Sequence, residues 1–338
     1  QDRHFRFTRF VDQWRLNPAC IGGVHFFALA FFYRTPLRKG GFRENCWPAV
    51  EQLRWDTLMT NLFEFSSSKR RFAVIGNPVA HSRSPEIHQM FGGQCGITLE
   101  YEAVQVDPGG LLQAVRNLQA RGFDGLNVTV PYKQEAYAMA DRLSARARVA
   151  TAVNTVRFES YERIFGDNTD GIGLLRDLEH NLSQLLRDAC LLVVGAGGAV
   201  RGVLEPLLSA GPAMLVVTNR TDDRAFSLVG AFSSYGSIRA VPLDQLDGQA
   251  FDVVINGTAA SLTGERPALP DNLFASGSLA YDMVYGDDRT PFLRWAQEQG
   301  ANRVADGWGM LVEQAAASFE LWHDVRPDTA PVLRSFRS

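Results

Sequence analysis

A lysine and an aspartate occupy positions where an α/β protein can carry out acid–base chemistry. Lys133 lies in "GLNVTVPYKQEA", which starts at Gly125 and reads as an apolar strand, a proline and a helix. Alternation along the strand places Asn127 and Thr129 on one face. Lys133 then falls in the first turn of the helix, at the carboxyl end of a parallel strand, where open α/β sheets bind ligands. The helix dipole disfavours a cation there, which argues against a lysine that is merely solvated.

Asp170, in "FGDNTDGIG", is the second candidate group. It opens an amphipathic segment over 170–182 that is suited to connect two domains. A lysine and an aspartate facing each other across a cleft can bind a hydroxyl and transfer its proton while a hydride leaves the same carbon. Asp170 can also be interpreted as the cap of the connector helix, and the two roles are compatible.

A pair of serines predicts an anion site in "NPVAHSRSPEIH". Ser82 and Ser84 are two residues apart, and Pro85 marks a helix start. Two hydroxyls and the free N–H groups of a helix N-terminus can hold a carboxylate. The alternative is that Ser84 is only an N-cap. His81 and His88 are interpreted as structural, because no carboxylate or cysteine is placed to complete a metal site.

The sequence "LLVVGAGGAVRGV" over 191–203 is typical of a dinucleotide-binding turn. A strand leads into the glycines, and a helix follows them. Small residues there let backbone N–H groups reach a pyrophosphate at the helix N-terminus. Val200 occupies the place of the third glycine of the strict motif. The predicted contact residues of the turn are Gly195, Ala196, Gly197 and Gly198.

The tip of the next strand favours NADP over NAD. NAD sites place an acid there to bind the ribose 2′-hydroxyl, whereas a guanidinium suits a 2′-phosphate. Asp222 and Asp223 follow closely, so NAD stays open as an alternative. The polar and basic residues at this tip are Asn219, Arg220, Thr221 and Arg224.

Strand and helix signals alternate from Phe72 onward and predict two α/β units, each with a mostly parallel sheet. The expected strands are 72–75, 99–106, 126–130, 155–158, 164–166, 191–194, 215–218, 253–256 and 279–284. The expected helices are 85–91, 111–119, 134–140, 170–182, 223–232, 291–299 and, as the last, 310–323.

Composition excludes several classes of protein. The 338 residues are 46% hydrophobic with a net charge of −3, which favours neither nucleic acid nor an anionic membrane as partner. The longest apolar run, 24–33, is too short to span a bilayer. The four cysteines lack metal or redox spacing, which predicts a reducing, cytoplasmic location and no bound metal. They are Cys20, Cys46, Cys95 and Cys190.

Residues 1–58 differ from the rest of the chain. They hold 12 of the 36 aromatic residues and nine basic against five acidic side chains, with poor periodicity. We interpret them as a non-native or disordered extension of a protein that begins at Met59. The alternative is a genuine amphipathic extension that contacts a partner.

From about Phe72 to Val332 the sequence resembles the shikimate dehydrogenases. The motifs that carry the resemblance are "GNPVAHSRSP", "NVTVPYK", "AVNT", "GDNTDGIG", "GAGGAVRG", "NRT", "YDMVY" and "ADGWGMLVEQA". The resemblance implies reversible NADP-dependent reduction of 3-dehydroshikimate to shikimate, in aromatic amino-acid biosynthesis. It implies an N-terminal α/β substrate domain (69–169 plus 308–338), a Rossmann-type NADP domain (170–307) and a last helix that returns to the first domain.

The resemblance also implies roles for individual residues. Lys133 and Asp170 would be the catalytic pair, and Ser82 and Ser84 would bind the substrate carboxylate. Further substrate contacts would be Thr129, Asn154, Tyr285 and Gln314. The pyrophosphate of the cofactor would contact Gly195 to Ala199. Its 2′-phosphate would contact the NRT tip and Arg224. Its nicotinamide would lie near Met283 and Gly307.

Two other functions stay open at this stage, a quinate/shikimate dehydrogenase of broader specificity and a non-catalytic NADP-binding sensor. The sensor would need neither Lys133 nor Asp170. A monomer and a homodimer are both compatible with the sequence. One departure from the family stands out, because members often read N-A-T-S where this chain has Asn256, Gly257, Thr258 and Ala259.

Overall fold

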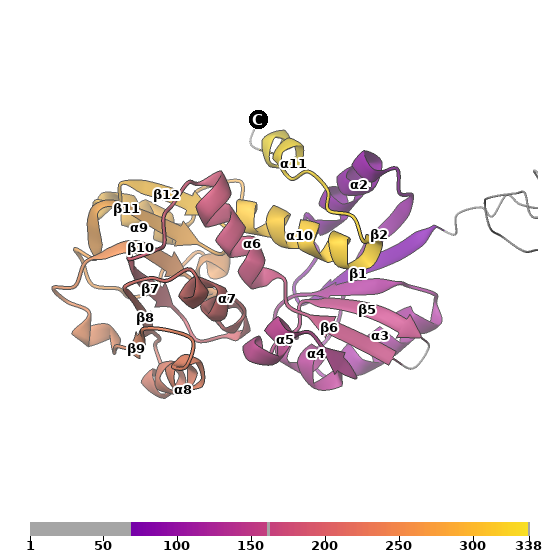
Figure 1. Cartoon of the computed structure of the whole chain (residues 1–338), viewed down its shortest axis with the longest axis horizontal. Helices are drawn as coiled ribbons and strands as arrows, with labels where there is room; N and C mark the ends of the chain where they lie inside the picture. The colour runs from indigo at the N-terminus through magenta and orange to yellow at the C-terminus, as the bar shows by residue number, and fades with distance from the viewer. Residues whose placement is uncertain (1–68, 161–162, 337–338) are drawn as a thin grey trace, which may run out of the picture. The chain divides into compact units, whose positions relative to one another are not determined.

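The computed structural model describes residues 69–160 and 163–336, which form two six-stranded sheets with helices on their faces (Figure 1). The predicted extension over 1–58 lies outside the described residues. None of the described helices is long and apolar enough to cross a membrane. The predicted pair of α/β units is confirmed.

The first sheet has the strand order β2-β1-β3-β5-β6-β4. Strand β1 lies between β2 and β3 and is parallel to both, so the strand order reverses at β1. The loops after β1 and β3 therefore leave the same edge of the sheet, where open α/β sheets bind ligands. The strands are β1 (Arg70–Gly76), β2 (Leu99–Gln105), β3 (Gly125–Val128), β4 (Arg142–Leu143), β5 (Thr155–Ser160) and β6 (Arg163–Asp167).

Antiparallel pairs interrupt this sheet on one side. Strand β5 runs antiparallel to both β3 and β6, while β4 is parallel to β6. The connection from β5 to β6 is too short for a crossover, so the two strands must reverse direction. The prediction of a mostly parallel sheet is correct, with this hairpin as the exception.

The second sheet is parallel throughout, with the order β12-β11-β10-β7-β8-β9. This is the Rossmann order, in which the first strand, β7, lies beside β10 at the reversal point. The crevice beyond β7 and β10 is where dinucleotides bind in this fold. The strands are β7 (Cys190–Val194), β8 (Met214–Thr218), β9 (Ile238–Ala240), β10 (Phe251–Asn256), β11 (Phe274–Asp282) and β12 (Arg303–Asp306).

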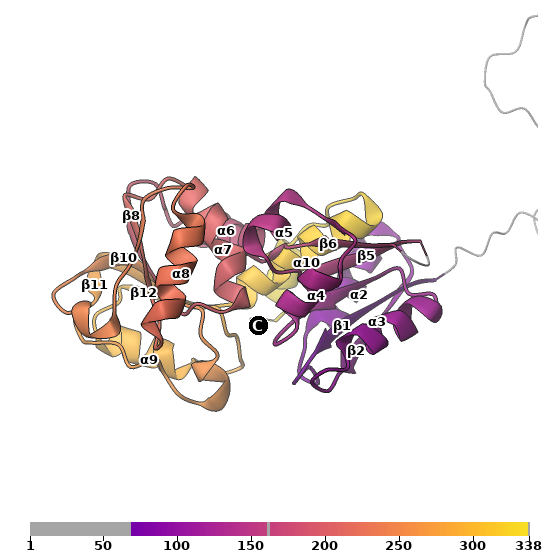
Figure 2. The same ribbon diagram turned by 90° about the horizontal axis from the view of Figure 1, so that it is seen from below.

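Strand β7, at the centre of the second sheet, is apolar without interruption, because its side chains are buried on both faces of the sheet. In β7, Leu191 and Val193 pack on one side, against α7 (Gly198–Ser209) and α8 (Asp222–Phe232). Leu192 and Val194 pack on the other side, against α9 (Pro291–Glu298). Figure 2 shows α7 and α8 together on their side of the sheet. The two-residue period explains why "CLLVV" is apolar without interruption.

Helices likewise cover both faces of the first sheet. One face packs on α3 (Leu111–Ala120), α4 (Lys133–Met139) and α5 (Ala145–Ala150). The other packs on α2 (Ser84–Cys95) and α10 (Trp308–His323). Helix α10 follows the last strand of the second sheet, which confirms that the chain returns to the first. It is not the last helix, however, because α11 (Ala330–Ser335) follows and inserts Val332 into the core shared with α2.

Helices α6 (Asp170–Arg176) and α10 lie side by side between the two sheets (Figure 1). A Cβ atom at Gly173 would lie 2.6 Å from the Cβ atom of Gln314, so glycine permits this close approach. The single helix predicted over 170–182 is instead α6 followed by a π-helical turn, Asp177–Asn181. This wider turn lets the buried Asp177 carboxylate accept a hydrogen bond from Tyr281 Oη, at 2.7 Å.

The elements that the sequence analysis missed are short or lack periodicity. They are β4, β9, β12, α5 and α11, none of which exceeds six residues. Three predicted strands also end early, since β2 ends at Gln105, β3 at Val128 and β11 at Asp282. Thr129 and Met283 therefore lie in loops just beyond their strands.

Candidate active site

The structure brings Lys133 and Asp170 into direct contact. Lys133 Nζ lies 2.6 Å from Asp170 Oδ2, and the two side chains are 12% and 6% exposed. Lys133 is the first residue of α4 and Asp170 the first residue of α6. The residue before Asp170, Thr169, is the N-cap of α6, so capping is not the role of Asp170. A nearly buried ion pair that retains some exposure can exchange a proton with a bound hydroxyl.

Asn154 and Gln314 join this pair, as the resemblance implies. Asn154 Nδ2 donates to Asp170 Oδ1 at 2.8 Å and lies 3.3 Å from Gln314 Oε1. Gln314 comes from α10, so the returning helix brings this side chain to the lysine–aspartate pair. Both residues are buried.

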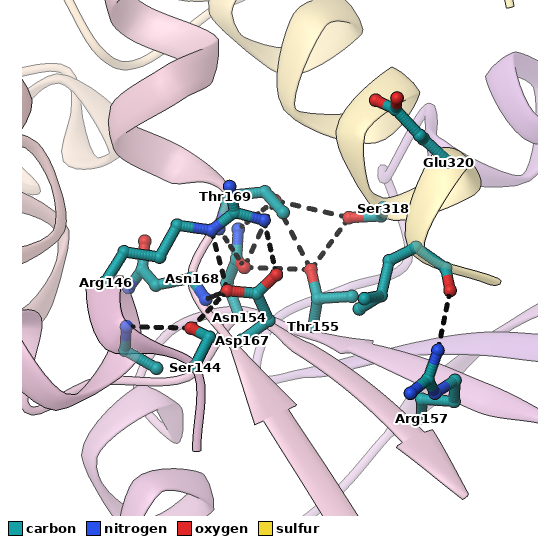
Figure 3. Close-up of polar contacts among 12 residues, drawn as sticks. Ser144, Arg146, Asn154, Thr155, Arg157, Asp167, Asn168, Thr169, Ser318 and Glu320 are labelled. Carbon is teal, nitrogen blue, oxygen red and sulfur yellow. Dashed lines mark hydrogen bonds and ion pairs between the residues drawn. The ribbon is translucent and has the colours of Figure 1, made fainter. Parts of the chain in front are cut away.

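A buried polar network supports Asn154 from behind (Figure 3). Asn154 Oδ1 accepts hydrogen bonds from Thr169 N at 2.8 Å and from Thr155 Oγ1 at 2.9 Å. The Thr155 and Ser318 hydroxyls are 2.7 Å apart, and Asn127 Nδ2 donates to Ser318 Oγ at 3.0 Å. Because its hydrogen bonds are satisfied, this network holds the Asn154 amide in one orientation.

Asp167 anchors the end of β6, which leads to Asp170 (Figure 3). Its Oδ1 atom accepts hydrogen bonds from Arg146 Nε at 2.7 Å and from Asn168 N at 2.7 Å. Ser144, the N-cap of α5, also donates its hydroxyl to this carboxylate. The ion pair with Arg146 thus ties α5 to the segment Asn168–Thr169–Asp170.

The predicted carboxylate site lies at the start of α2. Ser84 is buried, and its backbone N–H donates to Ser82 Oγ at 3.3 Å. The N-cap is Arg83 and not Ser84, which excludes the capping interpretation. Tyr285, from the loop after β11, packs against the apolar cluster that α2 shares with α10 and α11. Burial raises the pKa of Tyr285, so the phenol stays protonated at neutral pH.

Thr129 lies along the chain between residues 82–84, which we call the serine turn, and Lys133. Its neighbour Val130 accepts a backbone hydrogen bond from Asn77 N at 3.0 Å, which joins the loops after β1 and β3. The Thr129 side chain is half-buried. No hydrogen bond from its hydroxyl occurs within the described residues, which leaves that group free for a ligand.

The glycine turn joins β7 to α7 beside Lys133. Gly195 has a φ of 116°, which favours glycine, and its N–H donates to Thr218 O at 2.7 Å. Gly197 is exposed, and Ala196 and Ala199 are half-buried. A Cβ atom at Gly198 would lie 3.7 Å from the Cβ atom of Lys133. The N-terminus of α7 therefore lies next to the lysine–aspartate pair.

The tip of β8 presents two exposed arginines. Arg220 and Arg224 form no ion pair within the described part of the chain. Asn219 Nδ2 donates to Thr221 O at 2.9 Å, and Thr221 is the N-cap of α8. Asp222 and Asp223 lie in the first turn of α8, where the helix dipole favours acids. This location gives both aspartates a structural role, which removes the main argument for NAD.

Met283 and Gly307 lie together at the end of the second sheet. Met283 N donates to Asn256 O at 2.9 Å, and Gly307 N donates to Val284 O at 3.2 Å. The Sδ atom of Met283 lies 3.1 Å from the position of a Cβ atom at Gly257. These residues lie just beyond the carboxyl ends of β11 and β12, at the edge where open α/β sheets bind ligands.

The Rossmann strand order, the glycine turn and the buried lysine–aspartate pair define a nicotinamide-dependent dehydrogenase. Three family models match: a shikimate dehydrogenase substrate binding domain over 74–156, a shikimate/quinate 5-dehydrogenase over 177–264 and a shikimate 5′-dehydrogenase C-terminal domain over 307–335. The shikimate dehydrogenase (NADP(+)) of Alkalilimnicola ehrlichii is 53% identical, covering 79% of this chain and 98% of that relative. The chain belongs to the shikimate dehydrogenase family.

Solved structures agree with this assignment. An Ael1 enzyme from Pseudomonas putida is 46% identical with a TM-score of 0.74, and shikimate 5-dehydrogenase from Thermus thermophilus in complex with NADP(H) and shikimate is 37% identical with a TM-score of 0.71. Each covers 79% of this chain and 98% of the matched chain.

Sequence reasoning missed the polar network behind the site. Ser318 lies outside the quoted motifs, and Thr155 belongs to them only as the end of "AVNT", because their partners in the network are distant in sequence. The only signal was Asn127, a polar residue within an otherwise apolar strand, which proves to be buried and bonded to Tyr101 Oη at 2.6 Å.

Proposed function

We propose that Lys133 and Asp170 are the catalytic pair of an NADP-dependent shikimate dehydrogenase that interconverts 3-dehydroshikimate and shikimate. The observation that carries the assignment is the 2.6 Å contact between Lys133 Nζ and Asp170 Oδ2, beside the N-terminus of α7. A non-catalytic NADP sensor would gain nothing from a nearly buried ion pair at this place.

The serine turn supports a substrate carboxylate. Ser82 and Ser84 offer two hydroxyls at the start of the twelve-residue helix α2, where the helix dipole favours an anion. Thr129, Asn154 and Gln314 then present donors and acceptors that suit ring hydroxyls. Tyr285 closes the same turn from the second sheet.

The nucleotide site fits NADP in its chemistry. Helix α7 offers its N-terminal N–H groups to a pyrophosphate, and open space surrounds the Cβ position of Gly197. Arg220 and Arg224 offer two exposed guanidinium groups to a 2′-phosphate. When bound, NADPH supplies a hydride to the substrate carbon.

The protein provides orientation and proton transfer. Asp170 holds Lys133 Nζ towards the reacting oxygen, and Asn154 fixes the second oxygen of the same carboxylate. During ketone reduction Lys133 donates a proton to the developing alkoxide, and during oxidation it accepts the hydroxyl proton. Asp170 stabilises the charged form of the lysine in both directions.

The reaction is tested by following reduced-nicotinamide absorbance with shikimate or quinate, each paired with NADP or NAD. We expect turnover with shikimate and NADP, and little with NAD. Arg220→Ala should raise the KM for NADP by about 10-fold or more, since charge-assisted hydrogen bonds contribute about 1.5–3 kcal/mol. Arg239→Ala, an exposed arginine beside Gln249, is the matched control. Comparable quinate turnover would establish the broader specificity instead.

Location and assembly form part of the same proposal. We place the enzyme in the cytoplasm, in keeping with the spacing of its cysteines, and expect a monomer or a homodimer without nucleic-acid partners. Cell fractionation and light scattering of the purified chain test these two statements.

A further inference from the structure

A fully buried carboxylate that the proposed mechanism does not use lies next to Met283. Asp282 is the last residue of β11 and is 0% exposed. Its Oδ1 atom accepts hydrogen bonds from Asn256 Nδ2 at 3.0 Å and from Val284 N at 3.1 Å. Its Oδ2 atom accepts hydrogen bonds from Ser261 Oγ at 2.7 Å and Thr290 Oγ1 at 2.6 Å.

These four donors occupy the lone pairs of the carboxylate without help from a cation. A carboxylate offers about four acceptor positions, and here each oxygen receives two hydrogen bonds. No arginine or lysine of the described residues forms an ion pair with Asp282. Burial raises its pKa, and the donated hydrogen bonds oppose that effect.

The donors come from three separate segments at the carboxyl end of the second sheet. Asn256 ends β10, and Ser261 lies in the 3-10 turn Ala260–Thr263. Thr290 is the N-cap of α9, where its hydroxyl also accepts a hydrogen bond from Leu293 N at 3.3 Å. Asp282 therefore joins the loop after β10 to the loop after β11.

The two loops contact each other, and the loop after β10 lies against the glycine turn of the proposed nucleotide site. Met283 N donates to Asn256 O at 2.9 Å, and Gly257 N donates to Val194 O at 2.8 Å, directly before the glycine turn. Burying a carboxylate costs free energy, and apolar side chains would close the same loops without that cost. Stability alone is thus a poor reason for an acid at this position.

We propose that Asp282 is a positioning residue that holds Met283 and the loop after β10 against the nicotinamide end of the cofactor. This inference rests on the proposed placement of Met283 beside the nicotinamide. Asp282 acts through the loops that it joins and does not contact the substrate.

The first test is steady-state kinetics of Asp282→Asn, which keeps the side-chain shape but removes acceptor capacity. We expect the KM for NADPH to rise about 10-fold and kcat to fall, with the KM for 3-dehydroshikimate within twofold of wild type. Ser261→Ala, which removes one donor, should shift the same constants by less. Asp252→Asn is the matched control, because Asp252 is near the opposite end of β10, where Oδ2 accepts a hydrogen bond from Cys190 N at 2.8 Å.

The second test separates positioning of the nicotinamide from general damage to the domain. Calorimetry compares NADP with 2′-phospho-ADP-ribose, which lacks the nicotinamide. For Asp282→Asn we expect weaker binding of NADP and unchanged binding of the fragment. The inference would be overturned if Asp282→Asn weakened the binding of both ligands equally. It would also be overturned if Asp282→Asn had the same kinetic constants and affinities as Asp252→Asn. If the wild type does not turn over shikimate, the proposed function is wrong. The calorimetric comparison would then still test whether Asp282 positions the nicotinamide end of the cofactor.

Discussion

At the scale of single residues, the site combines groups that are individually ordinary. Lys133 and Asp170 would form a simple ion pair on a surface, where such pairs contribute little to stability. Their low exposure and the hydrogen bond from Asn154 to Asp170 hold the pair in one arrangement, as the proposed proton transfer requires. The chemistry therefore depends on burial and orientation as much as on residue type.

Replacement of the lysine should separate catalysis from binding. We expect Lys133→Met to lower kcat by about 10²–10⁴-fold, the range of general acid–base catalysis, while the Kd for shikimate changes little. Lys69→Met serves as the control, since Lys69 is exposed and paired with Glu100 on the first sheet. Stopped-flow absorbance and calorimetry measure the two quantities. Retained turnover in Lys133→Met would remove this residue from the mechanism.

His88 should make stability depend on pH. Burial, with a smaller contribution from His323, lowers the pKa of His88 to about 3. Below the unfolded pKa of 6.5 the unfolded chain therefore binds a proton that the native chain does not, and stability falls with pH until about pH 3. When the pH falls from 7 to 5, we expect the free energy of unfolding to decrease by about 2 kcal/mol less in His88→Phe than in the wild type. Urea unfolding at each pH measures this, and equal losses would contradict the buried neutral state.

At the scale of elements, the loops after strands carry the site. The serine turn follows β1, Lys133 follows β3, the glycine turn follows β7 and Met283 follows β11. Parallel strands place their carboxyl ends at one edge, so each sheet gathers its functional groups there. Val200 and Gly257, the two departures from the usual motifs, lie next to each other at this edge. A Cβ atom at Gly257 would lie 2.5 Å from Val200 Cγ2.

Val200 and Gly257 should therefore be energetically coupled. Gly257→Ala alone forces Val200 aside and should cost about 1–3 kcal/mol through overpacking. Val200→Ala should relieve that clash. The free energy of unfolding should therefore fall less in the double variant than the sum of the losses in the two single variants. Urea unfolding of the four proteins closes the cycle. An additive result would show that the loop moves freely away from Val200.

At the scale of the whole molecule, α6 and α10 connect the two sheets and deliver Asp170 and Gln314 to one site. Most of the proposed site residues lie within the three stretches that the family models match, whereas Asp170, Met283 and Tyr285 lie in the gaps between those stretches. The domain limits inferred from the sequence, and the interpretation of residues 1–58 as an extension, stay predictions.

Removal of residues 1–58 should leave the enzyme intact. We expect kcat and both KM values within twofold of the full chain, because the sheets and the proposed site lie beyond this segment. Matched assays of the full and shortened chains, with thermal unfolding as a folding control, measure the effect. A large loss of activity in a folded shortened protein would support the alternative of a functional extension.

The sequence by itself determined the local features of this protein. Alternation and glycine placement predicted the strands and the nucleotide turn, and the chemistry of Lys133, Asp170 and Arg220 predicted their roles. These signals are local, because propensity and periodicity act over a few residues. Only the tertiary structure decided which groups meet across long separations, such as Ser318 with Asn127 and Asp282 with Ser261. Such contacts depend on the packing of whole elements, and no short stretch of sequence records them.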